Sequence, residues 1–168
     1  MKSLPLVKSV YNKCNWLYIL IAALILAIIS GFRLFGIDRD YYQYLDYFQA
    51  FLFEPEREFR YKIGFQYLTK IITVISNSFN FYLFNIAFIS LLPKIYLMAR
   101  HSRDLIISIL IYSLFIFPML EMTQIRSGLG LGFFYLGIYF INNYRTLFGY
   151  IILAFSSTLH ISTLSFTA

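Results

Sequence analysis

The chain has 168 residues, of which 60% are hydrophobic and only 13% are charged, and its formal net charge is +6 at neutral pH. A soluble domain usually has about 25% charged and about 45–50% apolar residues, so this composition predicts a protein that folds in lipid. The basic residues stand in short connections between apolar runs. They do not form one stripe with interleaved aromatic residues, which argues against nucleic acid as a partner.

The residues that bind metals or form disulfides are scarce. The single cysteine, Cys14, leaves no disulfide framework within one chain. The sequence also has no cysteine–histidine cluster with metal-ligand spacing. We therefore expect neither a metal nor another cofactor.

Several apolar runs predict transmembrane helices, because a spanning helix needs roughly 20 apolar residues. The predicted spans are residues 16–33, 79–98, 104–120, 123–141 and 147–166. The first run is too long for a signal-peptide core and no small-residue cleavage site follows it, so we expect an uncleaved span. The expected fold class is an all-α integral membrane protein with a single transmembrane domain over residues 1–168.

The lysines before the first span predict the orientation of the chain. Lys2, Lys8 and Lys13 place the N-terminus in the cytoplasm. With alternating spans, each side of the membrane carries the same number of basic residues, so these residues alone do not decide the orientation. Nearly all acidic residues, Glu121 among them, fall outside, whereas Lys94 falls inside. This leaves the net positive charge in the cytoplasm and favours this multi-pass topology.

The predicted outer loop, residues 34–78, contains two helical patterns. The first has aromatic and apolar residues at helical spacing: Tyr41, Tyr44, Leu45 and Phe48. The polar residues just ahead of it, Asp38 to Asp40, indicate a helix start. The second has apolar residues at the same spacing: Phe65, Leu68, Ile72 and Ile75. We expect it to start at Glu54-Pro55-Glu56, because proline is tolerated in the first turn, and to form an amphipathic helix on the outer membrane surface.

Arg126 stands close to the start of a predicted span. A cation there opposes the helix dipole and is costly at membrane depth, so helix stability does not explain it. An anionic ligand does, because a helix N-terminus offers unpaired N–H groups to phosphate and arginine adds a bidentate fork. Gln124 adds donors, and Gly128 and Gly132 permit close approach of a helix or ligand. The alternative is that Arg126 pairs with Glu121 or with lipid headgroups.

Two further polar features are expected at the same membrane face. At helical spacing His160 shares a face with Ser156, Ser157 and Thr163, and a histidine can carry a proton near neutral pH. The alternative is a hydrogen-bonded histidine inside a helix bundle. The stretch GIDRDYYQYLDYF sets carboxylates beside tyrosines, which suits sugar recognition, or is a solvated loop with interfacial tyrosines. The gathering of three polar features at one face favours a ligand site.

Four motifs follow one another along the chain: D-R-D-Y-x-x-Y, E-P-x-x-E-F, Q-I-R-S-G-L and L-H-x-S. This order resembles the EpsG-like, Wzy-type polysaccharide polymerases of bacterial capsule, exopolysaccharide and O-antigen synthesis, over essentially the whole chain. QIRSGLG is the most specific piece, although Ser127 stands where the family more often has a second glutamine.

The resemblance implies a GT-C-like glycosyltransferase in the bacterial cytoplasmic membrane. Such an enzyme polymerises undecaprenyl-diphosphate-linked oligosaccharide repeat units at the outer face, within the lipid bilayer and beside other polysaccharide-assembly membrane proteins. Arg126 would then neutralise the departing diphosphate, and His160 would position or deprotonate the acceptor hydroxyl. The implied substrate-binding residues are Gln124, Asp38, Arg39, Asp40, Tyr41 and Tyr44.

Other functions stay open on the sequence alone. Family members usually have more spans, so residues 1–168 are expected to be the incomplete N-terminal portion of a larger protein, inactive by itself. The alternatives are a flippase of lipid-linked glycans, a ligase that transfers a finished chain, and an inactive truncated membrane subunit. A flippase would set its charges in a central cavity, whereas the polar residues here gather at one face.

Overall fold

The structure is a computed structural model that describes residues 16–33, 38, 40–54, 57 and 61–159. These residues contain helices and turns and no strand, which confirms the all-α prediction. In chain order the helices are α1 (Trp16–Gly31), α2 (Tyr41–Phe53), α3 (Ile63–Ile75), α4 (Phe79–His101), α5 (Leu105–Ile111), the π-helical segments η1 (Tyr112–Ile116) and η2 (Pro118–Thr123), α6 (Ile125–Asn142) and α7 (Thr146–Leu159).

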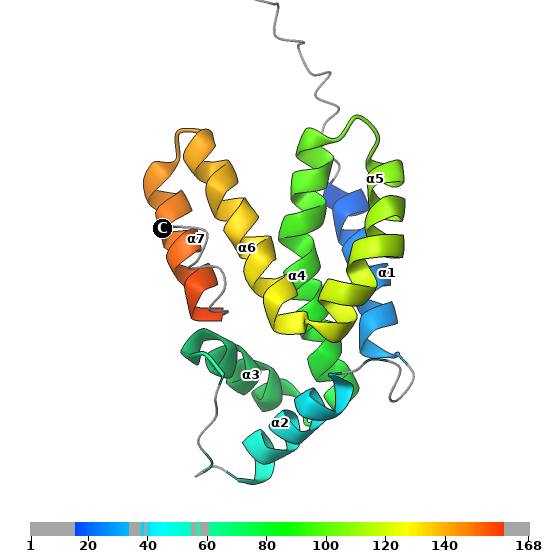
Figure 1. Cartoon of the computed structure of the whole chain (residues 1–168), viewed down its shortest axis with the longest axis vertical. Helices are drawn as coiled ribbons and strands as arrows, with labels where there is room; N and C mark the ends of the chain where they lie inside the picture. Colours follow the sequence, from blue (N-terminus) through cyan, green and yellow to red (C-terminus); the bar gives the residue numbers. More distant parts are fainter. Residues whose placement is uncertain (1–15, 34–37, 39, 55–56, 58–60, 160–168) are drawn as a thin grey trace, which may run out of the picture.

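The helices form an upright group and a crosswise pair. Figure 1 shows α1, α4, α5, α6 and α7 running roughly alongside one another, with α2 and α3 lying across one end of the group. Within the group, α1 packs on α4, α4 on α6 and α6 on α7. We call the end covered by the crosswise pair the α2–α3 end. It holds the last turns of α1 and α7 and the first turns of α4 and α6 (Figure 1).

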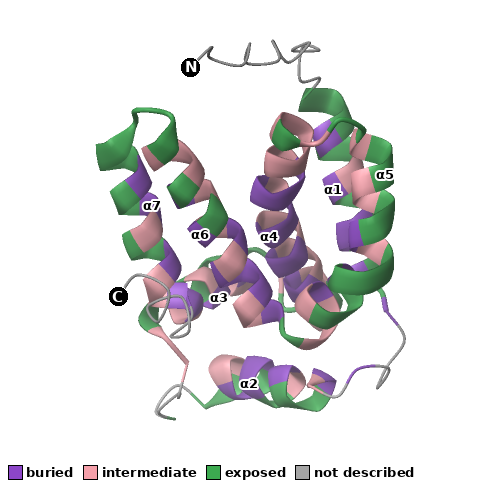
Figure 2. Cartoon of the chain, turned by 45° about the horizontal axis from the view of Figure 1, so that its top comes forward, coloured by how far each residue is buried: buried purple, intermediate pink, exposed green. Residues whose placement is uncertain are grey.

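Two clusters of buried side chains hold this arrangement together. Between α1 and α4, Ile19 and Ala23 are four residues apart on one helical face and pack among residues such as Leu91 and Ile95. At the α2–α3 end, aromatic residues dominate, with Phe48 of α2 and Tyr82 of α4 at a ring-centroid distance of 5.1 Å. Many residues on the outward faces of the upright helices are exposed (Figure 2). On α1 these exposed residues are largely apolar.

Over the described residues the predicted spans correspond to helical segments, with one difference, and residues 160–166 of the fifth span lie outside that part of the chain. The third span, residues 104–120, is not one α-helix but α5 followed by η1 and η2. Among the described residues, Phe79–His101 alone is long and apolar enough to cross a membrane by length and composition. Other apolar helices, including Trp16–Gly31 and Thr146–Leu159, are shorter over the part that the structure describes.

The first helix predicted in the loop is confirmed, and the start of the second was wrong. α2 begins at Tyr41 with Asp40 as its N-terminal cap residue. α3 begins at Ile63 rather than at Glu54-Pro55-Glu56, because Glu54 is the residue that ends α2. The Glu54 φ of −124° and ψ of 68° lie outside the helical region, which is disfavoured for a residue before proline.

Two glycines set the close packing of α6 on α7. A Cβ at Gly149 would lie 2.8 Å from the carbonyl oxygen of Gly137 and 2.9 Å from the Ile141 nitrogen. These backbone atoms cannot move aside as a flexible side chain could. We therefore expect Gly149→Val to lower the free energy of unfolding by about 1–3 kcal/mol, the usual cost of overpacking.

Thermal unfolding of the detergent-solubilised protein measures this cost. The matched control is Ala154→Val, which adds the same branched side chain at an exposed position of the same helix. Equal unfolding midpoints for the two variants would show that α6 and α7 are not in close backbone contact.

Candidate functional site

Arg126 lies in the first turn of α6, as the sequence predicted, at the α2–α3 end. Gln124 joins η2 to this helix. Its backbone N–H donates to the Met119 carbonyl at 2.8 Å, and its own carbonyl accepts from the Gly128 N–H at 2.9 Å. The Gln124 residue is exposed, so its amide is accessible beside Arg126.

The Arg126 guanidinium is held by tyrosine rings. Its Cζ atom lies 4.0 Å from the ring centroid of Tyr61 and 6.0 Å from that of Tyr44. These distances are in the range of cation–π contacts. Within the described part of the chain, its buried Nε has no hydrogen-bond partner. Arg126 also forms none of the ion pairs found among the described residues. No carboxylate of the described residues is therefore paired with this cation.

The alternative that Arg126 pairs with Glu121 is wrong. Glu121 is fully buried, and its Oε1 forms an ion pair with Lys94 of α4. The same oxygen accepts a hydrogen bond of 2.7 Å from the Tyr112 hydroxyl. Oε1 is therefore occupied inside the helix group, while the buried Oε2 has no hydrogen-bond partner among the described residues.

Tyr44, Tyr47 and Tyr61 form an aromatic cluster next to Arg126. The Tyr47 and Tyr61 rings meet edge to face at a centroid distance of 4.2 Å, and the Tyr47 hydroxyl donates to Thr69 Oγ1 at 3.3 Å. Burial raises the pKa of Tyr47 to about 12. Burial also raises the pKa of Tyr44, against the opposing effect of the nearby Arg126 guanidinium. These phenols therefore stay neutral near pH 7 and do not themselves compensate the charge of Arg126.

The raised pKa of Tyr47 makes stability depend on pH in alkaline solution. An unfolded tyrosine loses its proton near pH 10, whereas folded Tyr47 keeps it up to about pH 12. The unfolded state then binds fewer protons between these values, so stability falls as the pH rises from about 10 to about 12. We expect Tyr47→Phe to show a shallower fall than the wild type in unfolding midpoints measured from pH 9 to 12. An identical slope would contradict the assignment.

A second arginine of the same end is already neutralised. Arg33 Nε lies 2.7 Å from Asp38 Oδ2, with both side chains buried, and the Arg33 Cζ is 5.6 Å from the Tyr41 ring centroid. Burial raises the pKa of Asp38, and Arg33 opposes that effect. Arg33 also donates to the Ser30 hydroxyl at 3.3 Å. Asp38 therefore has a structural role as the ion-pair partner of Arg33. Its contact with a sugar stays a prediction.

The structure brings together only some of the residues predicted for the site. Tyr41 and Tyr44 are buried on the inner face of α2, next to Arg33 and Arg126 respectively. Asp40 precedes that helix without a side-chain capping hydrogen bond. Arg39 and His160 lie outside the described residues, so their roles stay predictions.

Sequence reasoning missed Tyr61 and the buried Lys94–Glu121 pair. The predicted topology has Lys94 and Glu121 on opposite sides of the membrane, whereas in the structure they are in contact. Lys94 also donates to the Ser90 hydroxyl at 2.9 Å. The sequence signal for this pair is Lys94, a single ionisable residue inside an apolar run. Such a residue indicates a buried partner or a functional site.

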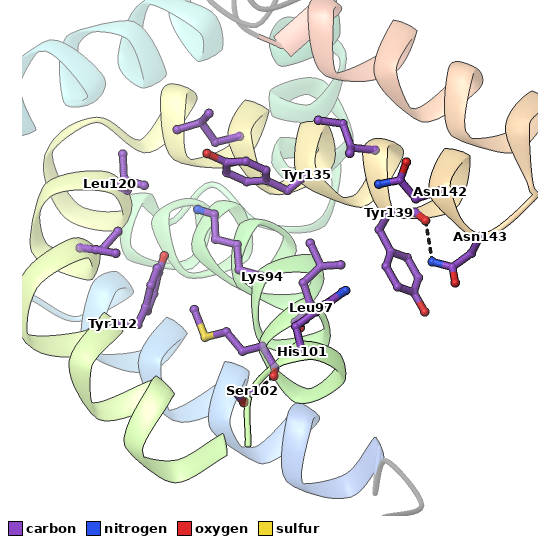
Figure 3. A pocket seen from close by; sticks show the side chains of 14 residues that line it. Lys94, Leu97, His101, Ser102, Tyr112, Leu120, Tyr135, Tyr139, Asn142 and Asn143 are labelled. Atoms are coloured by element: carbon purple, nitrogen blue, oxygen red, sulfur yellow. Dashed lines mark hydrogen bonds between the residues drawn. The ribbon is translucent and has the colours of Figure 1, made fainter. Parts of the chain in front are cut away.

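A groove of about 780 Å³ opens between α4, α6 and the η1–η2 segment (Figure 3). Its wall is mostly apolar, with Lys94, His101 and Asn142 among its polar residues. The Lys94 charge is neutralised by Glu121, so this lysine leaves no unpaired cation for a ligand. Among the described residues, no group of three or more His, Cys, Asp or Glu side chains could hold a metal ion.

The fold and the site define an all-helical protein with exposed apolar helix faces and a tyrosine-bound arginine at one end. The chain belongs to the EpsG family, whose family model matches residues 16–168. Membership in this family indicates a polymerase-type role in polysaccharide biosynthesis. No curated protein and no solved structure matches the chain.

Proposed function

We propose that this chain acts in the polymerisation of undecaprenyl-diphosphate-linked oligosaccharide repeat units, in capsule or exopolysaccharide biosynthesis. Membership in the EpsG family supports the reaction class. The observation that supports the chemistry is the Arg126 guanidinium. It lies at a helix N-terminus against neutral tyrosines, and no described carboxylate neutralises it.

In the proposed reaction, an acceptor sugar hydroxyl attacks the anomeric carbon of a lipid-linked chain. A glycosidic C–O bond forms, the C–O bond to the lipid diphosphate breaks, and its electron pair leaves with the diphosphate. Arg126 stabilises this growing negative charge through charge-assisted hydrogen bonds. The positive end of the α6 helix dipole adds to this stabilisation. The resemblance assigns to His160 the uptake of the hydroxyl proton.

We place the protein in the bacterial cytoplasmic membrane as a multi-pass protein with a cytoplasmic N-terminus. The large apolar residues exposed along α1 support this, because soluble proteins rarely expose extended apolar patches. In this orientation the α2–α3 end faces outward. Ile71, Val74 and Ile75 of α3 are exposed, which suits a helix that lies on the outer leaflet.

A gene deletion tests the proposal in the cell. We expect lipid-linked single repeat units to accumulate on the outer leaflet, and the wild-type gene to restore long chains. Accumulation on the inner leaflet would contradict a polymerase and indicate a flippase. Accumulation of long lipid-linked chains would instead indicate a ligase.

A further inference from the structure

The connection between α5 and α6 is π-helical over most of its length. At the end of η1 the Phe117 N–H donates to the Tyr112 carbonyl, and at the end of η2 the Gln124 N–H donates to the Met119 carbonyl at 2.8 Å. Both bonds reach back five residues. Such turns are rare and occur mostly singly, frequently at functional sites. Two successive π segments therefore need tertiary contacts that hold them.

The buried residues of the two segments supply these contacts. Tyr112 is the buried residue of η1 and Glu121 that of η2, and the Tyr112 hydroxyl donates to Glu121 Oε1 at 2.7 Å. Lys94 of α4 forms an ion pair with the same oxygen. From α1, the Ser30 hydroxyl donates to the Glu121 backbone carbonyl at 2.8 Å. Glu121 is thus bound to α1, α4 and η1 at once.

Glu121 also lies directly against the first turns of α6. A Cβ added at Gly128 would lie 2.5 Å from the Leu120 carbonyl oxygen and 3.3 Å from Glu121 Oε1. Gly128 therefore lets the end of η2 contact the helix that carries Arg126. Because Gly128 is in contact with Leu120 and Glu121, a displacement of Glu121 would also displace the start of α6.

We infer that the Lys94–Glu121 pair is a positioning element that fixes the register of η2 and thereby sets Arg126 against Tyr44 and Tyr61. A slip of one residue would rotate a helical side chain by about 100° and take Arg126 away from both rings. Compared with apolar residues of similar volume, a buried ion pair adds little stability, and its best-attested role is to specify register. The effect on ligand binding rests on the proposed function, whereas the positional claim does not.

The double variant Lys94→Met/Glu121→Met, in the full-length protein in nanodiscs, separates positioning from stability. Its Tm is expected to fall much less than that of Glu121→Ala, because apolar side chains replace the pair, although the Tyr112 hydroxyl still loses its acceptor. Amide hydrogen exchange over residues 119–128 is expected to become about tenfold faster, since this segment opens locally. Affinity for undecaprenyl diphosphate is expected to fall about tenfold or more, because small displacements of a positioned group are costly.

The matched control is Arg57→Met/Asp46→Met, which removes an exposed ion pair at the protein surface and should alter none of these readouts. Unchanged exchange over residues 119–128 in the Lys94/Glu121 double variant would overturn the inference. If that variant does not fold, Lys94→Gln/Glu121→Gln, which removes both charges of the pair, replaces it. Faster exchange there supports the inference and unchanged exchange overturns it. A wild-type protein that fails to bind undecaprenyl diphosphate would contradict the proposed function, while the exchange data still decide the positional claim.

Discussion

Arg126→Ala in the full-length protein is expected to slow polymer formation by about 10²–10³-fold, the usual loss when one preorganised donor to a developing anion is removed. The variant should fold, because the described residues form no ion pair with Arg126. Its cation–π partners are the Tyr44 and Tyr61 rings, which keep their other contacts in the aromatic cluster at this end. The measurement is the rate of chain extension from purified lipid-linked repeats.

Two variants make the result specific to the guanidinium. Arg126→Lys keeps the charge but loses the planar fork, so it should fall between the wild type and Arg126→Ala. Arg145→Ala removes an exposed arginine from the turn between α6 and α7, at the opposite end of α6, and should retain the wild-type rate. Equal rates for Arg126→Ala and Arg145→Ala would mean that charge at the start of α6 does not assist the reaction.

Glu121→Ala is expected to produce the largest loss of stability in the described part of the chain. The change leaves the Lys94 ammonium buried without its carboxylate and the Tyr112 hydroxyl without its acceptor. Breaking a buried pair in this way costs about 3–5 kcal/mol of unfolding free energy. Unfolding of the detergent-solubilised protein, followed by helical circular dichroism, measures the loss.

The exposed pair provides the comparison. Asp46→Ala removes a carboxylate that contacts Arg57 at 3.1 Å on the surface, and such pairs contribute only about 0–1 kcal/mol. Adding Lys94→Met to Glu121→Ala should recover much of the lost stability, because the unpaired charge is then gone. Similar losses for Glu121→Ala and Asp46→Ala would show that Glu121 is not buried against Lys94.

The sequence was sufficient to predict the helices that local patterns encode. α2 follows from tyrosines at helical spacing behind an aspartate that precedes the first turn, and α1 follows from an uninterrupted apolar run. Arg126 was identified because a cation at a helix start has no role in helix stability. These features depend on residues close together in the chain, where spacing is informative.

The features that the sequence did not predict depend on contacts between residues that are far apart in the chain. Tyr61 lies before the first turn of α3, outside any helical pattern, yet its ring is the closest to Arg126. The π segments were read as one α-helix because their geometry depends on Glu121 meeting Lys94 and Ser30 from other helices. The predicted topology has Lys94 inside and Glu121 outside, so it did not predict that the two residues pair.

The central claim is that Arg126 binds the diphosphate of a lipid-linked sugar chain. The most direct test is to compare the affinity of the full-length protein for undecaprenyl diphosphate and undecaprenyl monophosphate in neutral-lipid nanodiscs. We expect the wild type to prefer the diphosphate and Arg126→Ala to lose that preference while retaining the wild-type Tm. An unchanged preference in Arg126→Ala would contradict the claim.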